Sequence, residues 1–134
     1  MDVITLYKNE YVKLRYHPKP RVIHHEILKL PPSDVFRTML TKGAECLEQN
    51  EAKKWLSNDT RNILVAPEDF QWGDNVWAPR VIKAGFKYWA IVMPKQAVAK
   101  LQMHRFCREY RERGVAVELF QMVHAAMKWL SSVD

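Results

Sequence analysis

The chain is 134 residues long, and 48% of its residues are hydrophobic and 27% charged. This length fits one domain with its own core, and this composition excludes a largely disordered chain. The net charge of +6 is spread evenly, with 11 basic against 8 acidic residues in 1–67 and 10 against 7 in 68–134. The one local cluster, Arg105, Arg108 and Arg111, lies on the solvent face of a predicted helix. Specific nucleic-acid binding is therefore not expected.

The first residues and the cysteines indicate where in the cell the protein is expected. No basic segment followed by an apolar one opens the sequence, and no apolar run approaches the roughly 20 residues of a membrane span. Cys46 and Cys107 lie far apart on apolar stripes of predicted helices, as buried thiols do. We expect a cytoplasmic protein without a membrane span.

The chain opens with strand-forming segments. Residues 3–7 and 11–16 are rich in β-branched and aromatic types and flank a short polar turn, which predicts a hairpin. Two prolines within residues 17–20 prevent a continuous strand there. A third strand over residues 21–28 would complete an antiparallel meander.

The middle of the chain predicts a helix, a short strand and a bent helix. Ser33 follows two prolines and precedes a helical apolar stripe, so we expect it to be the N-cap. Residues 53–58 are expected to form the strand. Pro67 suits the first turn of the next helix, which runs to about residue 84, and Pro79 is expected to kink or break it.

The second half alternates strands with helices. The apolar run over residues 88–93 is typical of a central strand covered on both faces. A helix over 96–113, a strand over 115–120 and a C-terminal helix from Val123 follow. This order predicts an α/β fold, in which a parallel part of the sheet follows the antiparallel meander.

Motifs of common catalytic and nucleotide sites are missing. The sequence contains no GxGxxG, no GxxxxGK[ST] and no GxSxG. Only His24 and Glu26 of the His24–Glu26 segment share a face of a strand, and two ligands do not make a metal site. We interpret His24 and His25 as polar residues of an edge strand, and we expect no enzyme, metal or cofactor.

One loop is a candidate binding site. Asp59, Thr60, Arg61 and Asn62 follow a predicted strand and precede a helix whose first turn carries Glu68. Ligands of open α/β sheets bind outside the carboxyl ends of strands, and helix N-termini favour anions. The alternative is structural, because Asp and Asn side chains also build turns.

The tryptophans are a second candidate. Trp72 and Trp77 lie on the predicted bent helix, and Trp55 and Trp89 lie on neighbouring predicted strands. Two roles fit such dense aromatic residues: they line a ligand pocket, or they fill the core.

Four segments together resemble the SpoIIAA-like, or STAS-like, family of small bacterial proteins. They are YKNEYVKLRYHP, KKWLSNDTRN, APEDFQWGDNVWAPRVIKAGFKYWAIVMPK and VELFQMVHAAMKWL, and they cover nearly the whole chain. The resemblance implies a single STAS-like domain over residues 1–134. It would have a mixed β-sheet, an antiparallel N-terminal meander and about four helices packed mainly on one face.

The resemblance also implies a function. STAS domains mostly bind protein partners, and in the anti-sigma-factor antagonists a phosphorylated Ser or Thr releases the partner. In the matching stretch, residues 59–68, only Thr60 offers a hydroxyl. We therefore expect a non-enzymatic regulatory or protein-interaction module with an unknown protein partner. The alternative is a small apolar-ligand or lipid-binding protein whose pocket uses Trp72 and Trp77. A homodimer through an exposed edge strand is a further hypothesis.

Overall fold

A computed structural model describes residues 2–62 and 64–133 of the chain. Its strands are β1 (Ile4–Lys8), β2 (Val12–His17), β3 (Val22–Ile27), β4 (Lys54–Asn58), β5 (Tyr88–Val92) and β6 (Ala116–Phe120). Its helices are α1 (Ser33–Asn50), α2 (Pro67–Trp72), the π-helical segment η1 (Gly73–Trp77), α3 (Ala78–Lys83), α4 (Ala97–Glu112) and α5 (Val123–Ser132). These bounds differ from those predicted for the strands by at most one residue.

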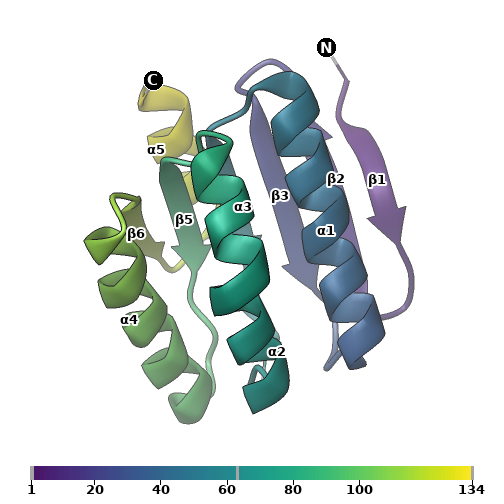
Figure 1. Cartoon of the computed structure of the whole chain (residues 1–134), viewed down its shortest axis with the longest axis vertical. Coiled ribbons are helices and arrows are strands. Elements are labelled where there is room, and N and C mark those ends of the chain that lie inside the picture. The colour runs from purple at the N-terminus through teal and green to yellow at the C-terminus, as the bar shows by residue number, and fades with distance from the viewer. Residues whose placement is uncertain (1, 63, 134) are drawn as a thin grey trace.

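The six strands form one mixed sheet in the order β1-β2-β3-β4-β5-β6 (Figure 1). The pairs β1–β2 and β2–β3 are antiparallel, whereas β3–β4, β4–β5 and β5–β6 are parallel. This arrangement confirms the α/β class and the antiparallel meander that leads into a parallel half. Because strands that are neighbours in sequence are also neighbours in space, each parallel pair is joined by a single helical connection.

The helices cover the two faces of the sheet unequally. In Figure 1, α1, the run from α2 to α3, and α4 lie side by side in front of the sheet, and α5 lies behind it. The larger buried cluster lies between the front helices and the sheet and includes Leu14, Met39 and Trp55. A smaller cluster, which includes Leu56 and Leu130, joins α5 to the back of the sheet.

The position of β3 corrects one interpretation of the sequence. This strand lies between β2 and β4, so it is not an edge strand. His24 and His25 are consequently both buried, and because they are adjacent on a strand they face opposite layers. The strands at the edges of the described sheet are β1 and β6.

The helical run from Pro67 to Lys83 accommodates Pro79 without a break. The N–H of Ala78 donates to the carbonyl of Gly73, five residues earlier, which is the π-helical pattern. Pro79 has no N–H to donate, so a local change of hydrogen-bond spacing is the expected response to it. The helical backbone therefore continues through η1 into α3.

The prediction that Ser33 is the N-cap of α1 is wrong. Pro32 is the N-cap, and no side chain makes a capping hydrogen bond there. The Ser33 hydroxyl donates instead to Asp69 Oδ2 at 2.8 Å, and Arg37 Nε donates to Asp69 Oδ1 at 2.9 Å. The hydroxyl thus helps to tie the start of α1 to the start of α2.

Gly43 allows α1 to pack closely on the sheet. A Cβ atom added at this position would overlap the indole ring of Trp55. Trp55 is 1% exposed and belongs to the main core cluster. The absence of a side chain at Gly43 therefore sets the position of the indole on which the candidate site is built.

Candidate functional site

Three residues of the β4 segment share the front face of the sheet. Trp55, Ser57 and Asp59 occur at alternate positions, and all three are buried. Asp59 follows the last residue of the strand, and its N–H donates to the carbonyl of Val92 at 3.1 Å. The carboxyl side chain is therefore held at the carboxyl edge of the parallel strands.

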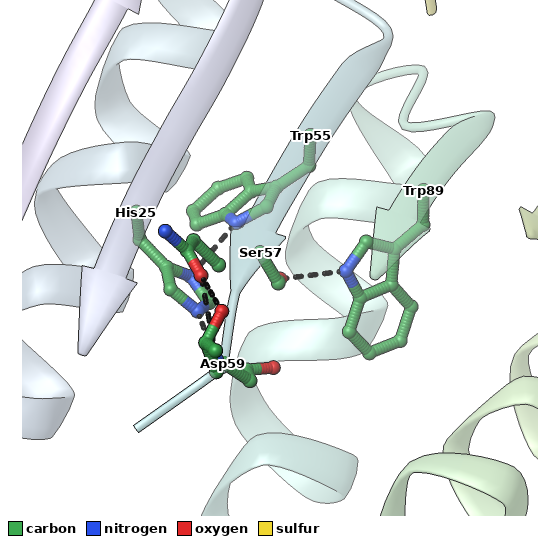
Figure 2. Close-up of polar contacts among 7 residues, drawn as sticks. His25, Trp55, Ser57, Asp59 and Trp89 are labelled. Atoms are coloured by element: carbon green, nitrogen blue, oxygen red, sulfur yellow. Dashed lines mark hydrogen bonds and ion pairs between the residues drawn. The ribbon is translucent and has the colours of Figure 1, made fainter. Parts of the chain in front are cut away.

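His25 of β3 connects the two ends of this row (Figure 2). Trp55 Nε1–H donates to His25 Nδ1 at 3.0 Å, and His25 Nε2 lies 3.0 Å from Asp59 Oδ1. An indole nitrogen can only donate, so Nδ1 accepts and the imidazole proton lies on Nε2. His25 therefore donates to the buried Asp59 carboxylate and replaces hydrogen bonds that water would make.

Ser57 lies beside His25 without forming a catalytic triad. Trp89 Nε1–H donates to Ser57 Oγ at 2.7 Å, as Figure 2 shows. Both nitrogens of His25 are already engaged by Trp55 and Asp59, so neither is left to take a proton from Ser57. The Ser, His and Asp of a triad are present, but the hydrogen bond that activates the serine is not made.

A cavity of about 60 Å³ lies between this network and the front helices. Its walls come from α1, α2, η1 and α4 and from the front face of the sheet. Most of the lining is apolar, and it includes three indole rings, those of Trp55, Trp77 and Trp89. This volume exceeds what one water needs, and it is well below the roughly 150 Å³ of an engineered cavity that holds benzene.

The 59–62 loop divides into an inner and an outer pair. Asp59 and Asn62 are 4% and 5% exposed, and both line the cavity. Thr60 is half-buried and Arg61 is exposed. The Thr60 hydroxyl donates to Asn58 Oδ1, and Asn62 N–H donates to the Asp59 carbonyl at 2.9 Å. The loop therefore makes the local bonds of a turn while it directs two polar residues inward.

The two candidate tryptophans of the helical run lie in different places. Trp77 lines the cavity, donates to the Leu40 carbonyl at 2.9 Å and meets Trp55 edge to face with ring centroids 5.1 Å apart. Trp72 is not among the residues that line the cavity. Its ring lies under the guanidinium of Arg37, at 5.4 Å.

An open groove of about 680 Å³ runs beside the cavity, between α2 and α4. Its walls include the exposed residues Leu64, Glu68 and Arg105. Glu68 thus lies on the outer side of α2, separate from the inner pair of the 59–62 loop. The groove joins the first turn of α2 to the solvent face of α4.

Phe70 and Asp74 lie where the groove meets the cavity. Each of these two residues lines the groove and also lines the cavity. The ring of Phe70 stacks on Phe106 with centroids 4.7 Å apart. The guanidinium of Arg105 lies 4.4 Å from the centre of the Phe70 ring. The cavity and the groove therefore border one another at Phe70 and Asp74.

The back of β3 carries a different pair. His24 Nδ1 lies 3.1 Å from His17 Nε2, and the two rings stack. His24 Nε2 is buried and has no hydrogen-bond partner within the described residues. Burial, with Arg15 and His17 nearby, lowers the pKa of His24 to about 3. Across residues 2–62 and 64–133, no group of three or more His, Cys, Asp or Glu residues is arranged to hold a metal ion.

Sequence motifs did not identify Ser57 and His25 as residues of the candidate site. The alternation of Trp55, Ser57 and Asp59 indicates one face of a strand, and His25 lies between two apolar residues at the same spacing. These two patterns could have identified both residues. Asp74 gives no such signal, because its place depends on the π-helical segment.

Comparisons with models of known protein families, with curated proteins and with solved structures found no match to this chain. Among the helices of the described residues, none has the length and apolar character needed to cross a membrane.

Proposed function

We propose that the chain is a non-enzymatic protein-interaction module of STAS-like type, whose partner binds in the groove between α2 and α4. The observation that carries this proposal is the groove itself. It is open, its volume of about 680 Å³ is that of a binding pocket, and the apolar side chain of Leu64 is exposed on its wall. Glu68 and Arg105 supply opposite charges with which a partner can be oriented.

The architecture supports the STAS-like part of the proposal. A mixed sheet with an antiparallel start, and helices packed mainly on one face, are what the resemblance implies. Thr60 is the one hydroxyl of the matching stretch, and it is engaged by Asn58. Binding in the groove does not require its phosphorylation.

Site-specific crosslinking tests this function. A photoreactive amino acid at Leu64 or Gln71, in the groove, should capture a partner in extracts of the cells that express the chain. The same amino acid at Lys128, an exposed position on α5, is the control. The purified partner should then bind the Leu64→Asp variant at least tenfold more weakly than the parent chain. Equal capture at Lys128, or unchanged binding by Leu64→Asp, would contradict the proposal.

A second candidate function is small-ligand binding in the interior cavity. It is favoured by one observation: three indole rings and the buried Asn62 surround an unfilled space next to the 59–62 loop. Ligand pockets for larger molecules measure roughly 300–1,000 Å³, so the 60 Å³ cavity suits only a few atoms. The lipid form of this alternative is therefore not proposed.

A further inference from the structure

The cavity is acidic although the protein is basic. The chain carries a net charge of +6, yet the charged residues that line the cavity are Asp59, Asp69 and Asp74. No Lys or Arg lines it in the described part of the chain. Asp69 is neutralised by Arg37 at 2.9 Å, whereas neither Asp59 nor Asp74 is ion-paired with a Lys or Arg of the described residues.

Several polar groups of the lining lack hydrogen-bond partners. Asn62 is 5% exposed, and its side-chain amide makes no hydrogen bond to any described residue. Asp59 Oδ2, the Asp74 carboxylate and the Tyr110 hydroxyl are also without a hydrogen bond from the described residues. Burial raises the pKa of the Asp74 carboxyl above its usual range. Asp59, Asn62 and Tyr110 are at most 5% exposed, whereas Asp74 is partly exposed, and water can still reach the unpaired atoms of these side chains. A group that donates hydrogen bonds from within the cavity can take the place of that water.

The aromatic walls favour a positive charge on that group. Three indole rings and one phenol ring line the cavity, those of Trp55, Trp77, Trp89 and Tyr110. The faces of indole and phenol rings attract cations, and ammonium groups are commonly bound among such rings. A primary ammonium has three N–H donors and no acceptor, which suits two carboxylates and an amide oxygen.

The volume limits the size of the ligand. An engineered cavity of about 150 Å³ holds benzene, so by proportion 60 Å³ holds roughly two to three non-hydrogen atoms. We infer that the cavity binds the ammonium group of a small primary amine, of the size of methylammonium or ethylammonium. This inference rests on the second candidate function and specifies its ligand. The amine is either free or the end of a longer chain that leaves past Phe70 into the groove.

Titration of ¹⁵N-labelled protein with ethylammonium chloride tests the inference by NMR. The indole N–H signals of Trp55, Trp77 and Trp89 should shift and saturate, while those of Trp72 and Trp129 stay in place, since neither lines the cavity. Because a ligand of three non-hydrogen atoms gains limited binding energy, its Kd should be about 0.5 mM or weaker. Butylammonium distinguishes the two sources: it binds if the chain can leave through the wall, and fails to bind if the ligand is a free small amine.

Matched probes and variants separate charge from size. Sodium chloride at equal ionic strength should cause no saturable shift, and ethanol, a neutral ligand of the same size, should bind at least tenfold more weakly. Asp74→Asn should weaken ethylammonium binding at least tenfold. Glu109→Gln removes a nearby carboxylate that does not line the cavity, and it should change the Kd less than twofold.

Two results would overturn the inference. Equal saturable binding of ethanol and ethylammonium, or unchanged affinity in Asp74→Asn, would show that the cavity does not select a cation, while small-ligand binding would stand. The absence of saturable shifts with either probe up to 50 mM would remove both the cation site and the second candidate function. The groove proposal would be unaffected by either result.

Discussion

His24 and His25 are neighbours in the sequence, and they are buried in opposite layers of the molecule. Their exposed fractions are nearly the same, 5% and 6%. His25 has a partner at each ring nitrogen, Trp55 and Asp59, whereas Nε2 of His24 has none among the described residues. Burial alone therefore does not describe a buried imidazole, because its contribution to stability depends on whether its polar atoms are paired.

The two layers differ because their coverings differ. The front face lies under α1, the run from α2 to α3, and α4 (Figure 1). Residues of α1, α2, η1 and α4 line the cavity together with His25, Trp55 and Asp59. On the back face α5 packs against β4, β5 and β6. His24 stacks on His17 there and lies near Arg15. In the front layer both ring nitrogens of His25 are paired, whereas in the back layer one ring nitrogen of His24 has no partner among the described residues.

The largest expected effect breaks the front layer at Gly43. Gly43→Ala should lower the free energy of unfolding by more than about 3 kcal/mol, because the new methyl group overlaps the Trp55 ring that holds His25. Urea denaturation measures this loss. Gly73→Ala is the control, since an added Cβ there meets nothing within 4 Å and alanine suits a helix better by about 0.5–1 kcal/mol. Equal losses in the two variants would show that Trp55 can move aside.

The next effect compares the two histidines directly. His25→Leu should cost about 3 kcal/mol, since it leaves the Trp55 indole N–H and the Asp59 carboxylate buried without a partner. His24→Leu should change the free energy of unfolding at pH 7 by less than about 1 kcal/mol. Removal of the unpaired Nε2 offsets the loss of the Nδ1 contact with His17, which is partly exposed and can turn to water. Chemical denaturation of both variants measures the two changes in the free energy of unfolding. A larger loss from His24→Leu would reverse the comparison.

Acid should destabilise the protein through the back layer. An unfolded histidine titrates near pH 6.5, whereas the pKa of His24 is about 3. Between these values the unfolded state binds the additional proton, so the free energy of unfolding falls as the pH falls below 6.5. The fall is up to about 1.4 kcal/mol per pH unit, or about 2 kcal/mol at pH 5. Burial also lowers the pKa of His17, which acts in the same direction.

Denaturation at pH 7 and pH 5 measures this dependence, and His24→Leu is the matched variant. It should lose about 2 kcal/mol less than the parent chain over this interval, since the remaining titrating groups are common to both. The same loss in both proteins would assign the acid sensitivity to other groups.

The smallest expected effect concerns Arg15 and the pKa of His24 in the back layer. Arg15 lies near His24 and helps to lower its pKa, so Arg15→Met should raise that pKa from about 3. The Arg15–Glu26 pair, 3.4 Å apart and partly exposed, should contribute less than about 1 kcal/mol to stability at pH 7. NMR titration of His24 reports the pKa. If it does not move, burial by itself accounts for the low value.

Local patterns were sufficient to predict the elements but not the site. The strand bounds were predicted to within one residue, because β-branched runs, glycines and prolines act on their immediate neighbours. The hydrogen bond between His25 and Asp59 joins residues 34 positions apart and depends on the parallel register of β3 and β4. The prediction that Ser33 caps its own helix was wrong for the same reason, because its hydrogen-bond partner Asp69 lies on another helix.

The sequence by itself determined the order of strands and helices, the apolar faces they bury and the turns between them. It did so because these features follow from the conformational preferences and spacing of residues that are close in the chain. Only the tertiary structure decided that β3 is an interior strand, that Asp59 and Asn62 face inward while Thr60 and Arg61 face outward, and that an acidic cavity forms beneath three helices. These features depend on register and packing between distant segments, where the partner of a polar group is set by which elements meet.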